Sequence, residues 1–202
     1  MRLRLIPLLL AVAPFASADR LISLQTARKL TVGTMRAEYL SELSRGRVQM
    51  DYLAVGLNTS WEAELRTERF SGGDTNVTGD LVYNVVSPLS GISPGIAFGV
   101  QDVAGNTRDG RQLFGCVTFR EEDESRGQTI YEDVTLGLLI GRRTSPYLAV
   151  SFPFSPEFRL MLEASSLRAQ AGVEVRPLRN LGLRLIASQQ NLLGSASYTF
   201  RF

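Results

Sequence analysis

Apolar and polar residues alternate with a period of two along the C-terminal quarter of the chain. Successive side chains of a β-strand point to opposite faces, whereas an α-helix repeats every 3.6 residues. The pattern therefore predicts four strands, each with one apolar and one polar face. These four runs cover residues 158–165, 167–176, 181–188 and 194–202.

Weaker runs of the same kind occupy much of the preceding chain and are separated by residues typical of turns. At 47–57 the alternation slips, which predicts a β-bulge. No helical stripe or linker interrupts the series, so we expect a single antiparallel domain over residues 19–202. Together with the C-terminal runs, 12 candidate strands result, the earlier ones near residues 30–40, 47–57, 59–70, 75–86, 94–102, 111–120, 131–141 and 146–153.

The polar face of these runs helps to choose between two all-β architectures. It mixes Arg and Glu with Gly, Ser, Gln and Asn, while nearly every run also supplies an apolar face. A barrel in an outer membrane needs an apolar outside, a polar inside and no free strand edges. We therefore predict an up-and-down transmembrane β-barrel of about 12 strands, with Leu162, Val173 and Leu183 facing lipid. The alternative is a secreted soluble β-sandwich that acts as a binding protein.

The first 18 residues have the organisation of a secretory signal. Arg2 and Arg4 precede an apolar run from Leu5 to Phe15, and Ala16-Ser17-Ala18 matches a small-residue cleavage site. The apolar run is too short to span a bilayer as a helix. We expect cleavage after Ala18 and export of a chain that begins at Asp19.

Composition narrows the functional class. Once Arg2 and Arg4 are removed with the signal, the chain has 20 basic and 20 acidic residues, which argues against a nucleic-acid partner. Histidine is absent and Cys116 is the single cysteine, so His-dependent catalysis, His-ligated metals and internal disulfides are excluded. Glu62 and Glu64 could act as an acid–base pair, but we favour carboxylates that line a wet lumen. We expect a protein that is not an enzyme and needs no cofactor or metal.

Charged residues divide between the early and the late strands on the face that we assign to the lumen. Closing the barrel brings the last strand to the first, so the two sets would face each other across a narrow interior, where opposite charges attract strongly. We expect either an ion-pair network that fills the lumen or a transverse field across a water-filled constriction. The acidic set is Glu38, Asp51, Glu62, Glu64, Glu68 and Asp80, and the basic set is Arg159, Arg168, Arg176, Arg184 and Arg201.

Aromatic residues mark the C-terminal strand and several run ends. Tyr198, Phe200 and Phe202 alternate up to the last residue. This ending resembles the C-terminal signature by which bacterial outer-membrane barrels are recognised, which implies the barrel-assembly machinery and outer-membrane lipid as partners. Aromatics at other run ends suit either interfacial girdles or ordinary strand positions, among them Tyr39, Trp61, Tyr147 and Phe158.

One segment resembles a known family. Residues 93–105 read Ser-Pro-Gly-Ile-Ala-Phe-Gly-Val-Gln-Asp-Val-Ala-Gly, which is similar to a strand of the exopolysaccharide-associated outer-membrane barrel family (YjbH-like). The resemblance implies an outer-membrane component linked to polysaccharide export, with no catalytic residues to carry over. We expect a narrow pore or an accessory component of such export. The alternative is a structural or assembly barrel whose lumen is plugged.

Overall fold

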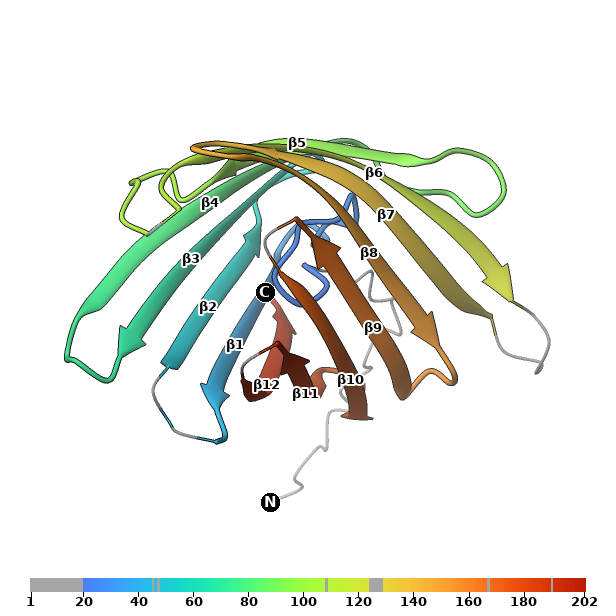
Figure 1. The fold of residues 1–202 in the computed structure, drawn as a ribbon. Coiled ribbons are helices and arrows are strands. Elements are labelled where there is room, and N and C mark those ends of the chain that lie inside the picture. The colour runs from blue at the N-terminus through green and yellow to red at the C-terminus, as the bar shows by residue number, and fades with distance from the viewer. Residues whose placement is uncertain are drawn as a thin grey trace, which may run out of the picture.

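The computed structural model describes residues 20–44, 46, 48–107, 109–123, 129–166, 168–189 and 191–202. They form one closed antiparallel barrel in which every strand pairs with its neighbours in sequence and β12 pairs with β1 (Figure 1). This confirms the predicted all-β, up-and-down barrel. The twelve strands are β1 (Thr34–Glu42), β2 (Val48–Gly56), β3 (Trp61–Phe70), β4 (Thr75–Val86), β5 (Gly95–Gln101), β6 (Gln112–Asp123), β7 (Ile130–Ile140), β8 (Thr144–Pro153), β9 (Phe158–Ser165), β10 (Ala169–Leu178), β11 (Leu181–Ser188) and β12 (Leu192–Arg201).

The seam between β1 and β12 closes the sheet. Its register runs without interruption from Thr34 opposite Arg201 to Glu42 opposite Leu193. Closure gives the backbone groups of the first and last strands partners in each other, so neither is left as an edge. Within the described part of the chain, no helix is long and apolar enough to cross a membrane.

The bulge expected at 47–57 is absent. Strand β2 pairs in unbroken register with β1 and with β3. Register shifts occur instead between β4 and β5 and between β10 and β11. The apparent slip in the alternation arises because Met50, a long apolar residue, lies on the inner face and packs on buried residues there.

The outer face of the barrel is apolar. Leu162 and Leu183 are exposed there, and Val173 lies on the same face because it pairs with the exposed Leu185. Tyr198 and Phe200 also point outward from β12. Exposed aliphatic and aromatic side chains occur on every strand, which is more than a water-soluble surface normally presents as one continuous area.

The interior is filled by a stretch of chain that precedes β1. Residues 20–33, called here the inner segment, run inside the barrel as an irregular coil (dark blue in Figure 1). Leu24 and Ala27 pack in one buried cluster with residues of β4 to β8, and Leu21 and Ile22 pack in a second cluster that includes Met161 and Ile186. The interior is therefore partly apolar, whereas the sequence predicted a polar lumen and a strand beginning near residue 30.

Small residues on the inner face make room for this segment. A Cβ atom at Gly56 would lie 2.5 Å from the carbonyl oxygen of Thr31 and 2.8 Å from that of Leu30. At Gly95 it would lie 2.5 Å from Cδ of Pro88 and 3.0 Å from the Cβ of Ala27. Because backbone atoms cannot yield as a flexible side chain can, these glycines permit the close approach of the inner segment. Gly95 and the buried Ala97 of the 93–105 stretch thus have a packing role.

Candidate functional site

The best-defined polar site is the set of contacts between the lumen wall and the inner segment. Glu163 on β9 is buried and accepts hydrogen bonds from three consecutive backbone N–H groups. Its Oε1 lies 2.5 Å from the nitrogen of Ile22, 2.9 Å from that of Ser23 and 3.0 Å from that of Leu24. The Ser23 hydroxyl donates to Oε2 at 2.8 Å. One carboxyl group therefore binds the beginning of the segment through several short hydrogen bonds.

Arg20 connects the inner segment to the opposite side of the wall. Its Nη1 lies 2.5 Å from Oε1 of Glu64 on β3, and both side chains are almost fully buried. The guanidinium carbon lies 3.7 Å from the centre of the Tyr52 ring, which gives a cation–π contact. Breaking such a pair would leave an uncompensated buried charge, so Arg20 fixes the segment at this point.

Further along the segment, backbone groups bond to polar side chains of other strands. The N–H of Ala27 donates to Thr118 Oγ1 at 2.9 Å, and the N–H of Leu30 donates to Glu62 Oε2 at 2.9 Å. The Tyr147 hydroxyl donates to the carbonyl of Gln25 at 2.9 Å. The inner segment thus takes the place of water as the hydrogen-bond partner of β3, β6, β8 and β9 inside the barrel.

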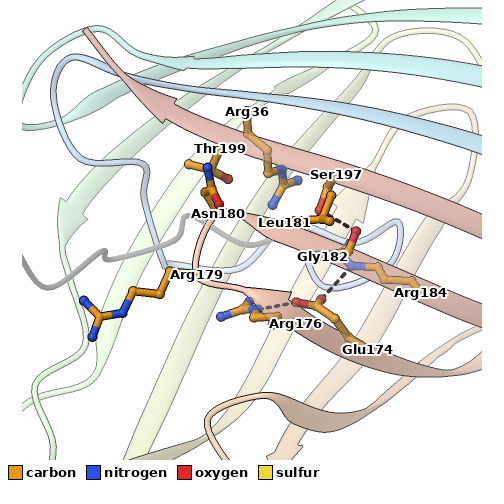
Figure 2. A pocket seen from close by; sticks show the side chains of 10 residues that line it. All are labelled: Arg36, Glu174, Arg176, Arg179, Asn180, Leu181, Gly182, Arg184, Ser197 and Thr199. Atoms are coloured by element: carbon orange, nitrogen blue, oxygen red, sulfur yellow. Dashed lines mark hydrogen bonds and ion pairs between the residues drawn. The ribbon is translucent and has the colours of Figure 1, made fainter.

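Arginines of the late strands surround a second buried carboxylate. Glu174 Oε2 lies 2.6 Å from Arg159 Nη2 and 2.7 Å from Arg184 Nε, and Oε1 contacts Arg176. Figure 2 shows the last two of these contacts beside a small pocket. Arg184 also lies 3.4 Å from Glu38 on β1. Among the described residues, this pair links the predicted acidic and basic sets.

The loop after β5 is held by Asp102, a buried residue with a left-handed backbone (φ 51°). Its carboxylate accepts hydrogen bonds from the Thr78 hydroxyl, from the Asn106 N–H, and from both the N–H and the hydroxyl of Thr107. Burial alone would raise the pKa of Asp102, but the hydrogen bonds from Thr107, Thr78 and Asn106 outweigh it and hold the pKa well below its usual range. The loop is therefore tied to the end of the lumen by a carboxylate that is ionised at neutral pH.

Most of the predicted lumen residues lie on the inner face. The described contacts of Glu62, Glu64 and Asp80 are with the inner segment or the Asp102 loop. The predicted cross-lumen network is thus largely replaced by contacts to the inner segment, because that segment occupies the space between the two sets. The inner-face positions from the two predicted sets are Glu38, Glu62, Glu64, Glu68, Asp80, Arg159, Arg176 and Arg184.

Asp51 and Arg168 do not line the lumen, and Arg201 reaches only its rim. Asp51 is paired with Tyr39 on the outer face of the barrel and lies 3.4 Å from Arg69, because β2 lacks the expected bulge. Arg168 is exposed in the turn between β9 and β10, where its backbone bonds to Ser165. Arg201 pairs with the inward Thr34 but is itself exposed at the end of β12.

Tyr147 was a candidate for an interfacial girdle, and this interpretation is wrong. It is buried on the inner face, opposite Gly137, whose missing side chain leaves space for the ring. Ala16 and Ala18 of the expected cleavage site lie outside the described residues.

Sequence reasoning missed the inner segment itself. A signal for it exists in the spacing of Leu21, Leu24, Ala27 and Leu30, which are apolar at every third position and buried. Such a period fits neither a strand nor a regular amphipathic helix. A second signal is the excess of small residues on the inner face, which would otherwise leave a partly empty barrel.

The described residues contain no group of three or more His, Cys, Asp or Glu side chains arranged to hold a metal ion. No protein-family model matches the chain. No curated protein matches it at a significant level. The resemblance of residues 93–105 to the YjbH-like family therefore gains no support from these comparisons.

Proposed function

We propose that this protein is a non-enzymatic outer-membrane β-barrel whose lumen is closed by its own inner segment. The observation that carries the proposal is the buried set of hydrogen bonds between residues 20–30 and side chains of β3, β6, β8 and β9. Of the functions expected from the sequence, this favours a plugged structural or assembly barrel over a narrow pore. Glu62 and Glu64, the residues considered for acid–base chemistry, are both engaged by the inner segment.

The proposed location rests on three features that agree. The first 18 residues resemble an export signal, the outer face of the barrel is apolar, and Tyr198, Phe200 and Phe202 form an ending suited to the barrel-assembly machinery. Cell fractionation should recover the protein with outer membranes, and N-terminal sequencing should begin at Asp19. Recovery in the soluble fraction without detergent would contradict the proposal.

The closed lumen is tested by conductance in planar bilayers. The wild-type barrel should give no stable current steps, because the inner segment occupies the lumen. A variant that lacks residues 20–30 should conduct, since the space that they fill becomes available to water. Stable steps from the wild-type protein would overturn the closed-lumen proposal.

The deletion needs a check on folding, because it removes much of the buried interior. Closed barrels retain their structure in detergent and migrate differently on gels before and after boiling. The variant Glu163→Ala provides a second test, since it removes the hydrogen bonds to residues 22–24 but leaves the wall otherwise intact. It should show brief openings that the wild type lacks.

A link to polysaccharide export is a narrower part of the proposal and rests on the resemblance of residues 93–105. In the structure this stretch forms β5 and the start of the Asp102 loop. We propose an accessory role in which the barrel supports an export assembly. A deletion strain should secrete less polysaccharide and recover with the wild-type gene. Unchanged secretion would exclude this role and leave the closed barrel itself standing.

A further inference from the structure

A pocket of about 330 Å³ lies between the inner segment and the end of the barrel at which β1 begins. One side is formed by the inner segment between Arg28 and Val32, and the other by the turns before β3 and after β4 and by Arg120 on β6. Val32 is 43% exposed, whereas Pro88 is buried. The pocket therefore leads from an exposed rim to a buried floor.

The lining of this pocket is largely aliphatic, although two arginines contribute to it. The charged ends of both arginines are bound to Asp133, which is not part of the lining. Arg28 Nη1 lies 2.9 Å from Asp133 Oδ2, and Arg120 Nε lies 2.8 Å from Asp133 Oδ1. With their guanidinium groups held there, these arginines cover the pocket with their methylene stems, beside Val32 and Pro88.

Lys29 supplies the remaining positive charge of the pocket and is the only lysine in the chain. The side chain is half-buried, and its ammonium group donates a hydrogen bond to the carbonyl oxygen of Thr59. An ammonium group has three donors, so this bond does not use all of them. Among the described residues, no carboxylate lines the pocket or forms an ion pair with Lys29. The pocket thus combines an apolar wall with one cationic donor.

We propose that this pocket binds a free medium-chain fatty acid, with its carboxylate on Lys29 and its alkyl chain against the aliphatic wall. The carboxylate gains charge-assisted hydrogen bonds, and the chain is removed from water, which is worth about 25 cal/mol per Å² of apolar surface. The volume lies at the lower end of the range of about 300–1,000 Å³ for small-ligand pockets, which suits one alkyl chain better than a two-chain lipid. The inference goes beyond the proposed function and is independent of whether the barrel conducts.

Protection of Lys29 from chemical acetylation tests the proposal. Because the chain has no other lysine, a water-soluble acetylating reagent followed by peptide mass spectrometry measures access to a single ε-amino group. The full-length protein in phosphatidylcholine nanodiscs is treated in the presence of octanoate, acetate or octan-1-ol. Octanoate should slow acetylation of Lys29 about tenfold, whereas acetate lacks the chain and octan-1-ol lacks the charge. No protection by octanoate, or equal protection by either of the other two compounds, would overturn the proposal.

Two variants show whether protection arises in the pocket. Arg179→Lys places a second amine in the exposed β10–β11 turn at the same end of the barrel. Octanoate should leave acetylation of this added amine unchanged, and equal slowing at both sites would overturn the proposal. Ser87→Phe fills part of the pocket and leaves Lys29 in place, so octanoate should no longer protect Lys29.

Calorimetric titration with octanoate tests the role of the ammonium group. Lys29→Met keeps an unbranched side chain without charge and should weaken octanoate binding about tenfold, through loss of a hydrogen bond to a charged group. Lys29→Arg keeps the charge and should bind octanoate nearly as well as the wild type. Unboiled gel migration checks that each variant is folded. Equal octanoate affinity in folded Lys29→Met and wild-type protein would refute the assignment.

Discussion

At the scale of single residues, Glu163 has the largest number of described contacts to the inner segment. Replacing it by Gln puts an N–H donor where one carboxylate oxygen accepts, and removes the charge that strengthens the remaining bonds. Each lost bond to a charged group is worth about 1.5–3 kcal/mol. We expect Glu163→Gln to raise amide hydrogen exchange at residues 22–24, measured by mass spectrometry. Glu157→Gln, in an exposed turn, is the control. Unchanged exchange at residues 22–24 would argue against this role of Glu163.

Asp102 predicts a dependence of stability on pH. The pKa of Asp102 is lower in the folded protein than the value of about 3.9 in the unfolded chain. Ionised Asp102 therefore stabilises the folded state fully above the unfolded pKa, and this stabilisation is lost as the pH falls through the folded pKa. Asp102→Asn should lower the free energy of unfolding by about 1–3 kcal/mol at pH 7, because one oxygen that binds Thr107 becomes a donor.

The difference in the free energy of unfolding between wild type and Asp102→Asn should become smaller below about pH 4. At this pH Asp102 begins to protonate in the unfolded chain. Urea unfolding at pH 7, 5 and 3 measures it. Asp109→Asn changes an exposed carboxylate of the same loop and should show no such trend. A difference that stays constant over this range would show that ionisation of Asp102 does not hold the loop.

Residue faces could be predicted from sequence wherever a strand is regular. Glu38, Glu62 and Arg184 follow the alternation of their strands and lie inside. Asp51 and Arg168 fail for different reasons. In β2, the apolar residue Met50 lies on the inner face, so the hydropathy pattern predicted the wrong face for Asp51. Arg168 lies outside the strand because its backbone N–H bonds to Ser165 in a tight turn. Hydropathy alone carries neither piece of information.

At the scale of elements, the strands were predictable and the inner segment was not. A strand in a barrel repeats its environment at every second residue, so its sequence has a clear period. The inner segment has no regular backbone hydrogen bonds of its own and obtains them from side chains of distant strands, such as Thr118 and Glu163. The three-residue spacing of its apolar residues indicates burial, but the path of the segment is determined by these tertiary contacts.

The fit between the inner segment and the wall can be tested at Gly56. A methyl group there would meet the carbonyl oxygens of Leu30 and Thr31, so Gly56→Ala should destabilise the barrel by about 1–3 kcal/mol. Gly72→Ala is the matched control, since nothing lies within 4 Å of the added atom. Equal free energies of unfolding in urea for the two variants would mean that the inner segment does not pack closely against Gly56.

At the scale of the whole molecule, the cost of placing a charge on the apolar outer face should depend on the depth of the substituted residue in the bilayer. Leu185 lies in the middle of β11 and is 49% exposed, whereas Leu178 lies at the end of β10 and is 60% exposed. In lipid vesicles, Leu185→Arg should lower the free energy of unfolding by about 2–4 kcal/mol, and Leu178→Arg should lower it by about 0–1 kcal/mol. Unfolding in urea from lipid vesicles provides both values. A smaller cost at Leu185 than at Leu178 would contradict a membrane centred on the strands.

The inner segment also constrains the order in which the barrel can assemble. It immediately precedes β1, yet it is held by Glu163 on β9 and by Arg184, whose Nη1 lies 3.1 Å from the carbonyl oxygen of Leu21. These contacts join residues 141 and 163 positions apart, and contacts so distant in sequence are slow to form. If the segment is enclosed before β1 pairs with β12, Arg20 and the three leucines of the segment need not enter a barrel that is already closed. The final pairing of β12 with β1 then traps the start of the described chain inside the completed barrel.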